Sequence, residues 1–217
     1  LLIRTAGGTP GAAREEVLRS QGLHDPFGHV KERENASAEK LYSTVVRELH
    51  ALGGRDRWLH LLRAVYAGNL FDLGSPATMN TADVSPDFMK AVKEVRKRPW
   101  LVDDFDDWAS RLDDAPPTPW ARALVLVDNA GPDFILGILP LARELALGGT
   151  QIILAANEKP SLNDITVDEV IEVVERLARV DRDMPALLEA GMFEVASTGN
   201  DIPLIDFSEV TDELNHA

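Results

Sequence analysis

The chain has 217 residues and a formal net charge of −14, so we expect an acidic surface that disfavours nucleic acid as a partner. It contains no cysteine, which excludes disulfides, thiolate metal ligands, iron–sulfur clusters and cysteine nucleophiles. Its apolar runs all fall short of the roughly 20 residues that span a membrane, so we expect no membrane partner and a cytoplasmic location.

The first half of the chain predicts a mainly helical structure. Residues 7–13 are rich in glycine and proline, which indicates a flexible lead-in. Beyond Arg14, apolar residues recur every three or four positions, the spacing of amphipathic helices. The residues that show this period are Leu41, Val45, Val46, Leu49, Leu52, Trp58, Leu61, Leu62, Val65, Tyr66, Phe88, Val92 and Val95. Residues 99–104 are predicted to be a short strand or an extended turn.

A proline-rich stretch, Pro116, Pro117 and Pro119, marks the best boundary within the chain. Proline has no N–H to donate to a helix or a sheet, and it drives the preceding residue toward extended geometry. We therefore predict two domains, a mainly helical one over residues 1–118 and an α/β one over residues 119–217.

The second domain is predicted to be a parallel sheet with helices between its strands. The expected strands are residues 123–127, 151–156 and 192–196, and the expected helices are residues 132–147 and 167–180. Pro140 should kink the first of these helices. Uninterrupted apolar strands that alternate with helices are typical of an α/β fold whose sheet is covered on both faces.

Each predicted strand runs into a polar loop, and ligands of open parallel sheets bind beyond the carboxyl ends of the strands. Asp128 and Asn129 follow the first strand, residues 157–164 follow the second, and residues 197–201 follow the third. Asp128, Asn129 and Asp164 offer two carboxylates and one amide oxygen, the hard ligands that Mg²⁺ or Mn²⁺ prefers. The sequence therefore predicts a divalent-metal site at this edge.

Simpler interpretations stay open at these positions. Asp128 and Asp164 are also placed to cap the helices that follow them, because aspartate is a preferred N-cap residue. Gly131 and the helix start beyond it either point backbone N–H groups at an anion or form a plain tight turn.

Other phosphate-binding patterns are missing from the sequence. There is no Gly-x-x-x-x-Gly-Lys-Ser/Thr loop and no Gly-x-Gly-x-x-Gly after a strand, which disfavours nucleoside triphosphates and dinucleotides. The Asp-x-Asp pattern of the haloacid dehalogenases would need an aspartate in place of Ala130, so a phosphoaspartate mechanism is disfavoured. The five histidines show no metal-ligand spacing.

Several long motifs resemble those of the metal-dependent damage-control phosphatases, the family once called domain of unknown function 89. The strongest follow the first two predicted strands, where the chain reads VDNAGPDFILG over residues 127–137 and LAANEKPSLNDIT over residues 154–166. Residues 67–75, 98–104 and 197–203 resemble further motifs of the family in the same order. The resemblance covers nearly the whole chain.

The resemblance implies a helical amino-terminal domain packed on a Rossmann-like parallel-sheet domain. It implies a divalent metal (Mn, Co, Ni or Mg) on Asp128, Asn129 and Asp164. We expect Asp128 and Asp164 to be catalytic as well, because either carboxylate can accept a proton from a metal-bound water. The branch that it points to resembles phosphatases of 4'-phosphopantetheine and its oxidised forms, so a small-molecule phosphate monoester is the expected partner. Four residues are expected to contact substrate unless they only order turns or cap helices: Asn69, Asp72, Asn157 and Asn163.

One part of the family pattern is absent from these 217 residues. The related branch carries a Glu-Gly-Met-Gly-Arg motif on a later strand and a lysine beyond it, and residues 190–193 are not an equivalent. We therefore expect a chain truncated at its carboxyl end. Two other functions stay open: a non-catalytic small-molecule binding or interaction domain with the same fold, and hydrolysis of a sugar phosphate. The sequence does not predict an oligomeric state.

Overall fold

The first half of the molecule is helical, as predicted. The computed structural model describes residues 10–70, 85–113, 120–203 and 205–216. The first helix begins at Pro10, so the flexible lead-in is wrong over residues 10–13, where proline at the first helical position presets the backbone. Residues 99–104 form turns and no strand. The helices of this half are α1 (Pro10–Ser20), α2 (Gly28–Ala51), α3 (Gly54–Asn69), α4 (Ser85–Glu94) and α5 (Phe105–Asp113).

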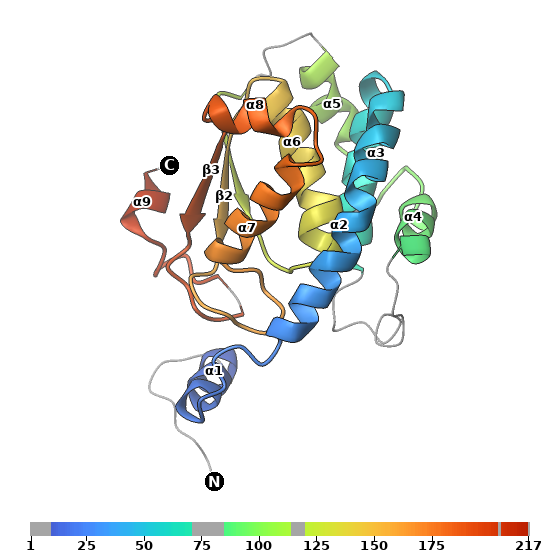
Figure 1. The fold of residues 1–217 in the computed structure, drawn as a ribbon. Helices are drawn as coiled ribbons and strands as arrows, with labels where there is room; N and C mark the ends of the chain where they lie inside the picture. The colour runs from blue at the N-terminus through green and yellow to red at the C-terminus, as the bar shows by residue number, and fades with distance from the viewer. Residues whose placement is uncertain (1–9, 71–84, 114–119, 204, 217) are drawn as a thin grey trace.

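A three-stranded parallel sheet forms the centre of the second half, which confirms the predicted α/β fold (Figure 1). The strands lie in chain order, β1-β2-β3. The elements are β1 (Arg122–Leu126), η1 (Asp133–Ile138), α6 (Leu139–Leu147), β2 (Gln151–Ala156), α7 (Val167–Ala178), α8 (Met184–Glu189), β3 (Phe193–Ser197) and α9 (Asp212–Asn215). Among the described residues, no helix is long and apolar enough to cross a membrane.

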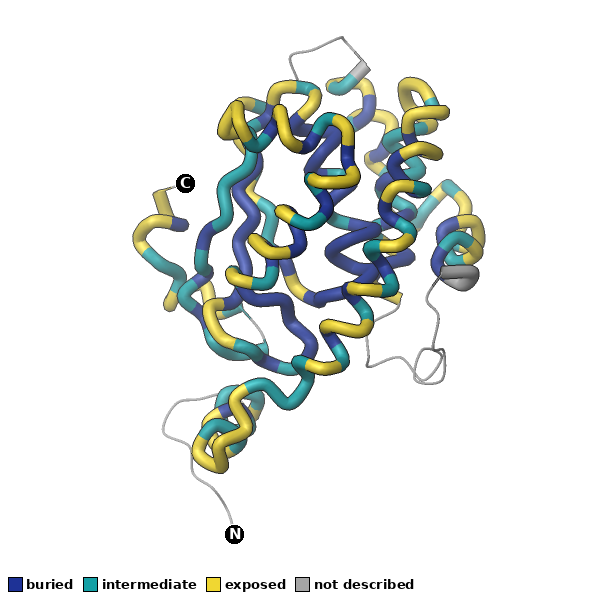
Figure 2. The backbone as a smooth tube through the Cα atoms, viewed as in Figure 1, coloured by how far each residue is buried: buried dark blue, intermediate teal, exposed yellow. Residues whose placement is uncertain are grey.

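The two faces of the sheet are covered unequally. Crossovers between parallel strands are right-handed, so the consecutive strand order places α6 and α7 on the same face. Leu154 of β2 joins the main core on that face, whereas Ile153 joins a small cluster with Leu214 of α9 on the other. Strand β2, which contributes to both clusters, is buried along most of its length (Figure 2). Leu124, which pairs with Ile153, is 47% exposed, so within the described residues the expected cover is complete on one face only.

The predicted helix over residues 132–147 is divided into two kinds of helix. The element η1 is a π-helix, and the N–H of Leu139 bonds to the carbonyl of Phe134, five residues back. Pro140 follows as the second residue of α6, directly after the π-helical turn, so the helix changes type next to the residue that has no N–H to donate. A change of helix type therefore stands where a kink was expected.

The helical and sheet halves share one hydrophobic core. It joins Tyr42 of α2, Phe134 of η1 and Leu154 of β2. Helix α3 packs so closely on η1 that a Cβ on Gly137 would lie 3.1 Å from the Cα of Val65. The domain division at residue 118 stays a prediction, since residues 114–119 lie outside the described residues.

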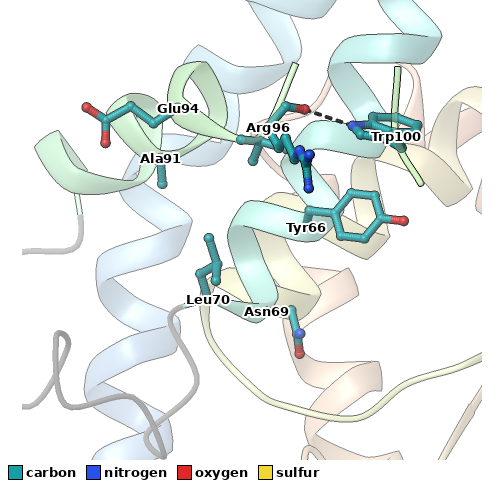
Figure 3. Close-up of a pocket in the computed structure, with 8 residues that line it drawn as sticks. Tyr66, Asn69, Leu70, Ala91, Glu94, Arg96 and Trp100 are labelled. Atoms are coloured by element: carbon teal, nitrogen blue, oxygen red, sulfur yellow. Dashed lines mark hydrogen bonds between the residues drawn. The ribbon is translucent and has the colours of Figure 1, made fainter. Parts of the chain in front are cut away.

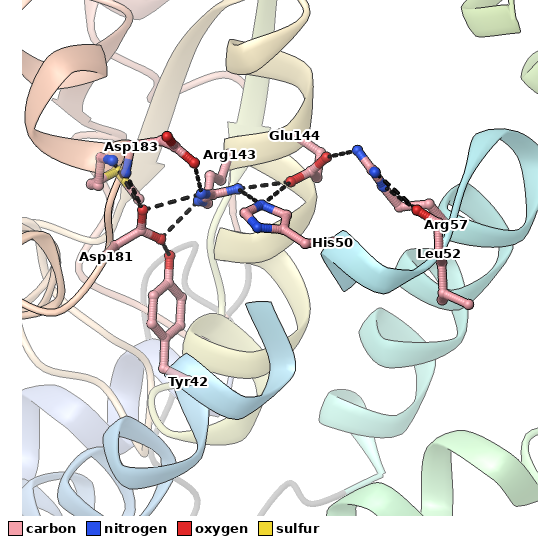
Figure 4. A network of polar contacts seen from close by, with 9 residues as sticks. Tyr42, His50, Leu52, Arg57, Arg143, Glu144, Asp181 and Asp183 are labelled. Atoms are coloured by element: carbon pink, nitrogen blue, oxygen red, sulfur yellow. Dashed lines mark hydrogen bonds and ion pairs between the residues drawn. The ribbon is translucent and has the colours of Figure 1, made fainter. Parts of the chain in front are cut away.

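A buried ion network joins α2 to α6 and to the start of α8 (Figure 4). Arg143, whose side chain is 1% exposed, donates from Nε and Nη2 to Asp181 at 2.7 and 3.2 Å. Its guanidinium also donates to Asp183 at 2.6 Å and to Glu144 at 2.7 Å. Tyr42 of α2 donates to Asp181 at 2.9 Å. Because each buried charge has a close partner of opposite sign, the network fixes how the three helices pack.

The stability of the fold should depend on pH through Asp181. Burial alone would raise the pKa of this carboxyl, but hydrogen bonds from Arg143 and from two backbone N–H groups lower it below the ordinary 3.8. A lowered pKa in the folded state means that ionised Asp181 stabilises the fold above about pH 4 and that this contribution is lost as the pH falls further. We expect the free energy of unfolding, from urea titrations between pH 3 and 6, to fall less steeply in Asp181→Asn than in the wild type. Equal slopes below pH 4 would exclude this role.

Candidate functional site

The two loops that carry the predicted metal ligands are hydrogen-bonded to each other at the carboxyl edge of the sheet. Asn129 and Asp164 form an isolated antiparallel bridge. On either side of it, the N–H of Ile165 donates to the carbonyl of Asp128 at 2.8 Å and the N–H of Ala130 donates to the carbonyl of Asn163 at 3.0 Å. Directly opposed residues of such a bridge have Cα atoms about 5 Å apart. The backbone therefore brings all three predicted ligands to one place.

The chemistry of these side chains fits a hard divalent cation. Asn129 and Asp164 are each 5% exposed, whereas Asp128 is exposed to solvent. Two carboxylates and one amide oxygen balance the charge of a divalent ion and leave positions for water and a phosphate oxygen. No cluster of three or more histidine, aspartate and glutamate side chains with metal-binding geometry occurs in the described part of the chain. An ion at this edge would therefore depend on the amide of Asn129.

Asp164 is held in one orientation by a neighbour from the end of β2. The Nδ2 of Asn157 donates to Oδ2 of Asp164 at 2.9 Å and to the carbonyl of Ile202 at 3.1 Å, and the hydroxyl of Thr198 donates to Oδ1 of Asn157 at 3.3 Å. A substrate contact of Asn157 stays a prediction. In the structure Asn157 contacts Asp164 directly, and its hydrogen bond holds the carboxylate in place.

The alternative interpretation of the aspartates as helix caps is wrong. The N-cap of α7 is Thr166, which forms a reciprocal capping box with Glu169, and the N-cap of η1 is Pro132. The N–H of Gly131 donates to Oδ1 of Asn35 at 2.7 Å, so it is not available to an anion. Gly131 forms the tight turn instead, with φ +74°.

The other predicted substrate residues lie at different depths. Asn163 is buried, and its carbonyl joins the two loops. Asn69 is exposed at the end of α3, where it lines a cavity of about 490 Å³ with Tyr66, Trp100 and Arg96 (Figure 3). Asp72 lies outside the described residues. The structure thus places Asn163 in the loop that carries Asp164, and Asn69 at a cavity beside the end of α3.

The end of α3 touches the loop between β1 and η1 with no side chain in between. A Cβ on Gly68 would lie 2.8 Å from the Cα of Asp133 and 3.0 Å from the carbonyl oxygen of Pro132. Asp133 in turn accepts the Nδ2 of Asn129 at 3.4 Å. Gly68 therefore sets how closely the helical half approaches the predicted ligands.

Replacing Gly68 by alanine should destabilise the fold even though alanine is the better helix former. Alanine gains about 1 kcal/mol in helix propensity, but the new methyl group meets backbone atoms that cannot rotate away, and overpacking of this kind costs about 1–3 kcal/mol. We expect a lower free energy of unfolding in urea for Gly68→Ala and little change for Gly53→Ala, where a Cβ would have open space. A Gly68→Ala variant more stable than the wild type would contradict the contact.

Sequence reasoning missed residues from the helical half that support the site. Lys31 and Asn35 of α2 are buried and bond to the ligand loops, and Arg19 of α1 donates to Asp201 and to the carbonyl of Pro160. Their only signal in the sequence is the spacing of Lys31 and Asn35, which puts both on one face of a helix. That spacing does not tell which face is buried.

Comparison with known proteins gives several relatives. A damage-control phosphatase of Arabidopsis thaliana is 40% identical over 204 residues, which are 93% of this chain and 54% of that protein. A 4'-phosphopantetheine phosphatase of Mus musculus is 38% identical over 200 residues, 91% of this chain and 24% of that protein. The chain thus spans about half the length of the plant relative and about a quarter of the mouse relative.

A solved structure and a family model agree with these matches. A DUF89 family protein from Pyrococcus horikoshii superimposes with a TM-score of 0.65 at 20% identity, over 95% of this chain and 61% of that one, which supports the fold. The model of the damage-control phosphatase ARMT1-like domain matches residues 11–217. The chain belongs to the damage-control phosphatase ARMT1-like domain family.

Proposed function

We propose that this chain is a metal-dependent phosphatase that hydrolyses a small-molecule phosphate monoester. The observation that carries the proposal is the backbone bridge between Asn129 and Asp164, which brings the backbones of Asp128, Asn129 and Asp164 together at the carboxyl edge of a parallel sheet. Membership of a phosphatase family supports the same reaction.

The residues of the site divide the work of hydrolysis. Asp128, Asn129 and Asp164 would hold the divalent ion, Mn, Co, Ni or Mg, which when bound neutralises charge on the phosphoryl group and acidifies a water molecule. Asp128 or Asp164 would accept the proton of the attacking water, and the solvent exposure of Asp128 favours Asp128. Asp164 is buried and oriented by Asn157. Water adds to phosphorus, and the alcohol leaves with a proton as inorganic phosphate forms.

The substrate that we propose is 4'-phosphopantetheine or one of its oxidised forms. The mouse relative, at 38% identity, is named for this substrate. A sugar phosphate is the competing substrate within the same reaction, and a non-catalytic binding domain is the competing function.

Phosphate release tests these three possibilities together. The purified chain is incubated with 4'-phosphopantetheine or with hexose phosphates, each with Mn²⁺, Co²⁺, Ni²⁺ or Mg²⁺ and each with excess chelator. We expect release from 4'-phosphopantetheine that stops with chelator and returns when metal is restored. Faster release from the hexose phosphates would overturn the substrate, and metal binding without any release would favour the non-catalytic domain.

A further inference from the structure

Helix α2 brings two buried polar side chains to the loops of the site. Lys31 and Asn35 are four residues apart, so they lie on the same face of the helix, one turn from each other. Lys31 is 0% exposed and Asn35 is 6% exposed. The side chain of Lys31 is closed to solvent, and the Oδ1 of Asn35 is occupied by a backbone N–H of the protein.

Lys31 bonds to the loop that carries Asp164. Its Nζ donates to the backbone carbonyl of Asp164 at 3.3 Å, and it pairs with Glu169 at 2.8 Å and with Asp25 at 3.1 Å. An ammonium group has three N–H donors, so the three partners can each accept one of them. The two carboxylates offset the cost of burying the charge, which leaves the third contact to fix the backbone of Asp164.

Glu169 extends this contact along the loop. It accepts the N–H of Thr166 at 2.8 Å as part of the capping box of α7. Lys31 therefore contacts the loop at Asp164 directly and at Thr166 through Glu169. The start of α7 and the predicted ligand before it are joined to the same ammonium group.

Asn35 bonds to the other loop. Its Oδ1 accepts the N–H of Gly131 at 2.7 Å, two residues after Asn129. The approach is close, because a Cβ on Gly131 would lie 2.9 Å from the Cβ of Glu34. The position of the loop with Asp128 and Asn129 is thus defined relative to α2.

We infer that Lys31 and Asn35 are positioning residues that together set the distance of Asp128 and Asn129 from Asp164, and hence the affinity of the site for a divalent metal. One rigid helix contacts both ligand loops, so it fixes their separation more firmly than the short backbone bridge does alone. The inference rests on the proposed function, because it takes these three residues as the metal ligands.

A second pair between the same helices provides a matched control. Glu39 of α2 and Arg176 of α7 form an ion pair at 2.8 Å, and their side chains are 22% and 40% exposed. This pair also joins α2 to α7, but it lies about two turns farther along both helices, and none of its hydrogen bonds reaches a ligand loop. If Lys31 only held the helices together, loss of either pair would have the same effect on metal binding.

The test is a calorimetric titration of the metal-free protein with Mn²⁺, beside thermal melts that show each variant is folded. For Lys31→Met and Asn35→Ala we expect the Kd for Mn²⁺ to rise about 10- to 100-fold, the usual effect of removing a group that orients a ligand. Asn35→Asp keeps the acceptor oxygen and should restore the affinity. Arg176→Met should stay within about threefold of the wild type, since it breaks only a partly exposed pair.

The outcomes separate this inference from the proposed function. A wild-type chain that binds no Mn²⁺ and releases no phosphate would overturn the proposed function itself. A wild-type chain that binds Mn²⁺, with Lys31→Met and Asn35→Ala lowering the melting temperature but leaving the Kd within threefold, would overturn the positioning role alone. Should Lys31→Met fail to fold, the comparison of Asn35→Ala with Asn35→Asp decides.

Discussion

Replacing Asp164 by asparagine is expected to abolish metal-dependent phosphate release while leaving the fold intact. The change keeps the shape of the side chain and an oxygen that accepts the Nδ2 of Asn157, but it removes one of the two negative charges that balance a divalent ion. Loss of groups that merely orient metal ligands costs about 10- to 100-fold, so loss of a charged ligand should cost at least about a hundredfold in kcat/KM. The measurement is phosphate release from 4'-phosphopantetheine at a fixed Mn²⁺ concentration.

A matched substitution shows whether this loss is specific to the site. Asp168 is an exposed residue in the first turn of α7, four positions from Asp164. Asp168→Asn makes the same change of charge close to Asp164 in the sequence but at no predicted ligand, so it should keep nearly full activity. Full metal-dependent turnover in Asp164→Asn would show that the ligand set is wrong, and an equal loss in both variants would point to the general charge of this surface.

Replacing Arg143 by methionine is expected to cause the largest loss of stability. The substitution leaves the buried carboxylate of Asp181 without the cation that lies 2.7 Å from it, and leaves Glu144 paired with Arg57 at 3.0 Å. Removing one partner of a buried ion pair costs about 3–5 kcal/mol, because an uncompensated charge stays inside the protein. The free energy of unfolding from urea titrations at pH 7 measures this loss.

Two variants control for the cause of that loss. Arg122→Met removes an arginine whose pair with Glu194 is 3.9 Å long and more than 40% exposed on both sides, so it should cost less than about 1 kcal/mol. The double variant Arg143→Met with Asp181→Asn should recover part of the stability, because the buried charge of Asp181 is removed together with its cation. No recovery would mean that lost packing, rather than the unpaired charge, destabilises Arg143→Met.

The sequence predicted the sheet because its signal is local. The run from Ile152 to Ala156 is apolar throughout and lies between Gly149 and Asn157, and β2 spans Gln151–Ala156 in the structure. The edge of a parallel sheet that binds ligands follows from strand direction alone, which is why Asp128, Asn129 and Asp164 were found without a structure. Their role as ligands stays a prediction.

What the sequence could not predict depends on contacts between distant segments. The period of α2 indicates a helix, yet it does not show that Lys31 and Asn35 are buried, since lysine and asparagine are usually exposed. The π-helix η1 packs closely against α3, where Gly137 meets the backbone of Val65, a residue far away in the sequence. The bridge between the ligand loops joins residues 35 positions apart, and no local pattern encodes it.

Helix α2 also connects two distant parts of the molecule, the loop of Asp164 and the Arg143 network. Lys31, near one end, reaches the loop of Asp164, and Tyr42, eleven residues on, belongs to the Arg143 network. Eleven residues of α-helix measure about 16 Å, so a tilt of about 5° around Tyr42 would move Lys31 by roughly 1.4 Å. A displacement of that size exceeds what a hydrogen bond tolerates. We therefore expect a substitution in the network to weaken the proposed metal binding without changing any residue of the site.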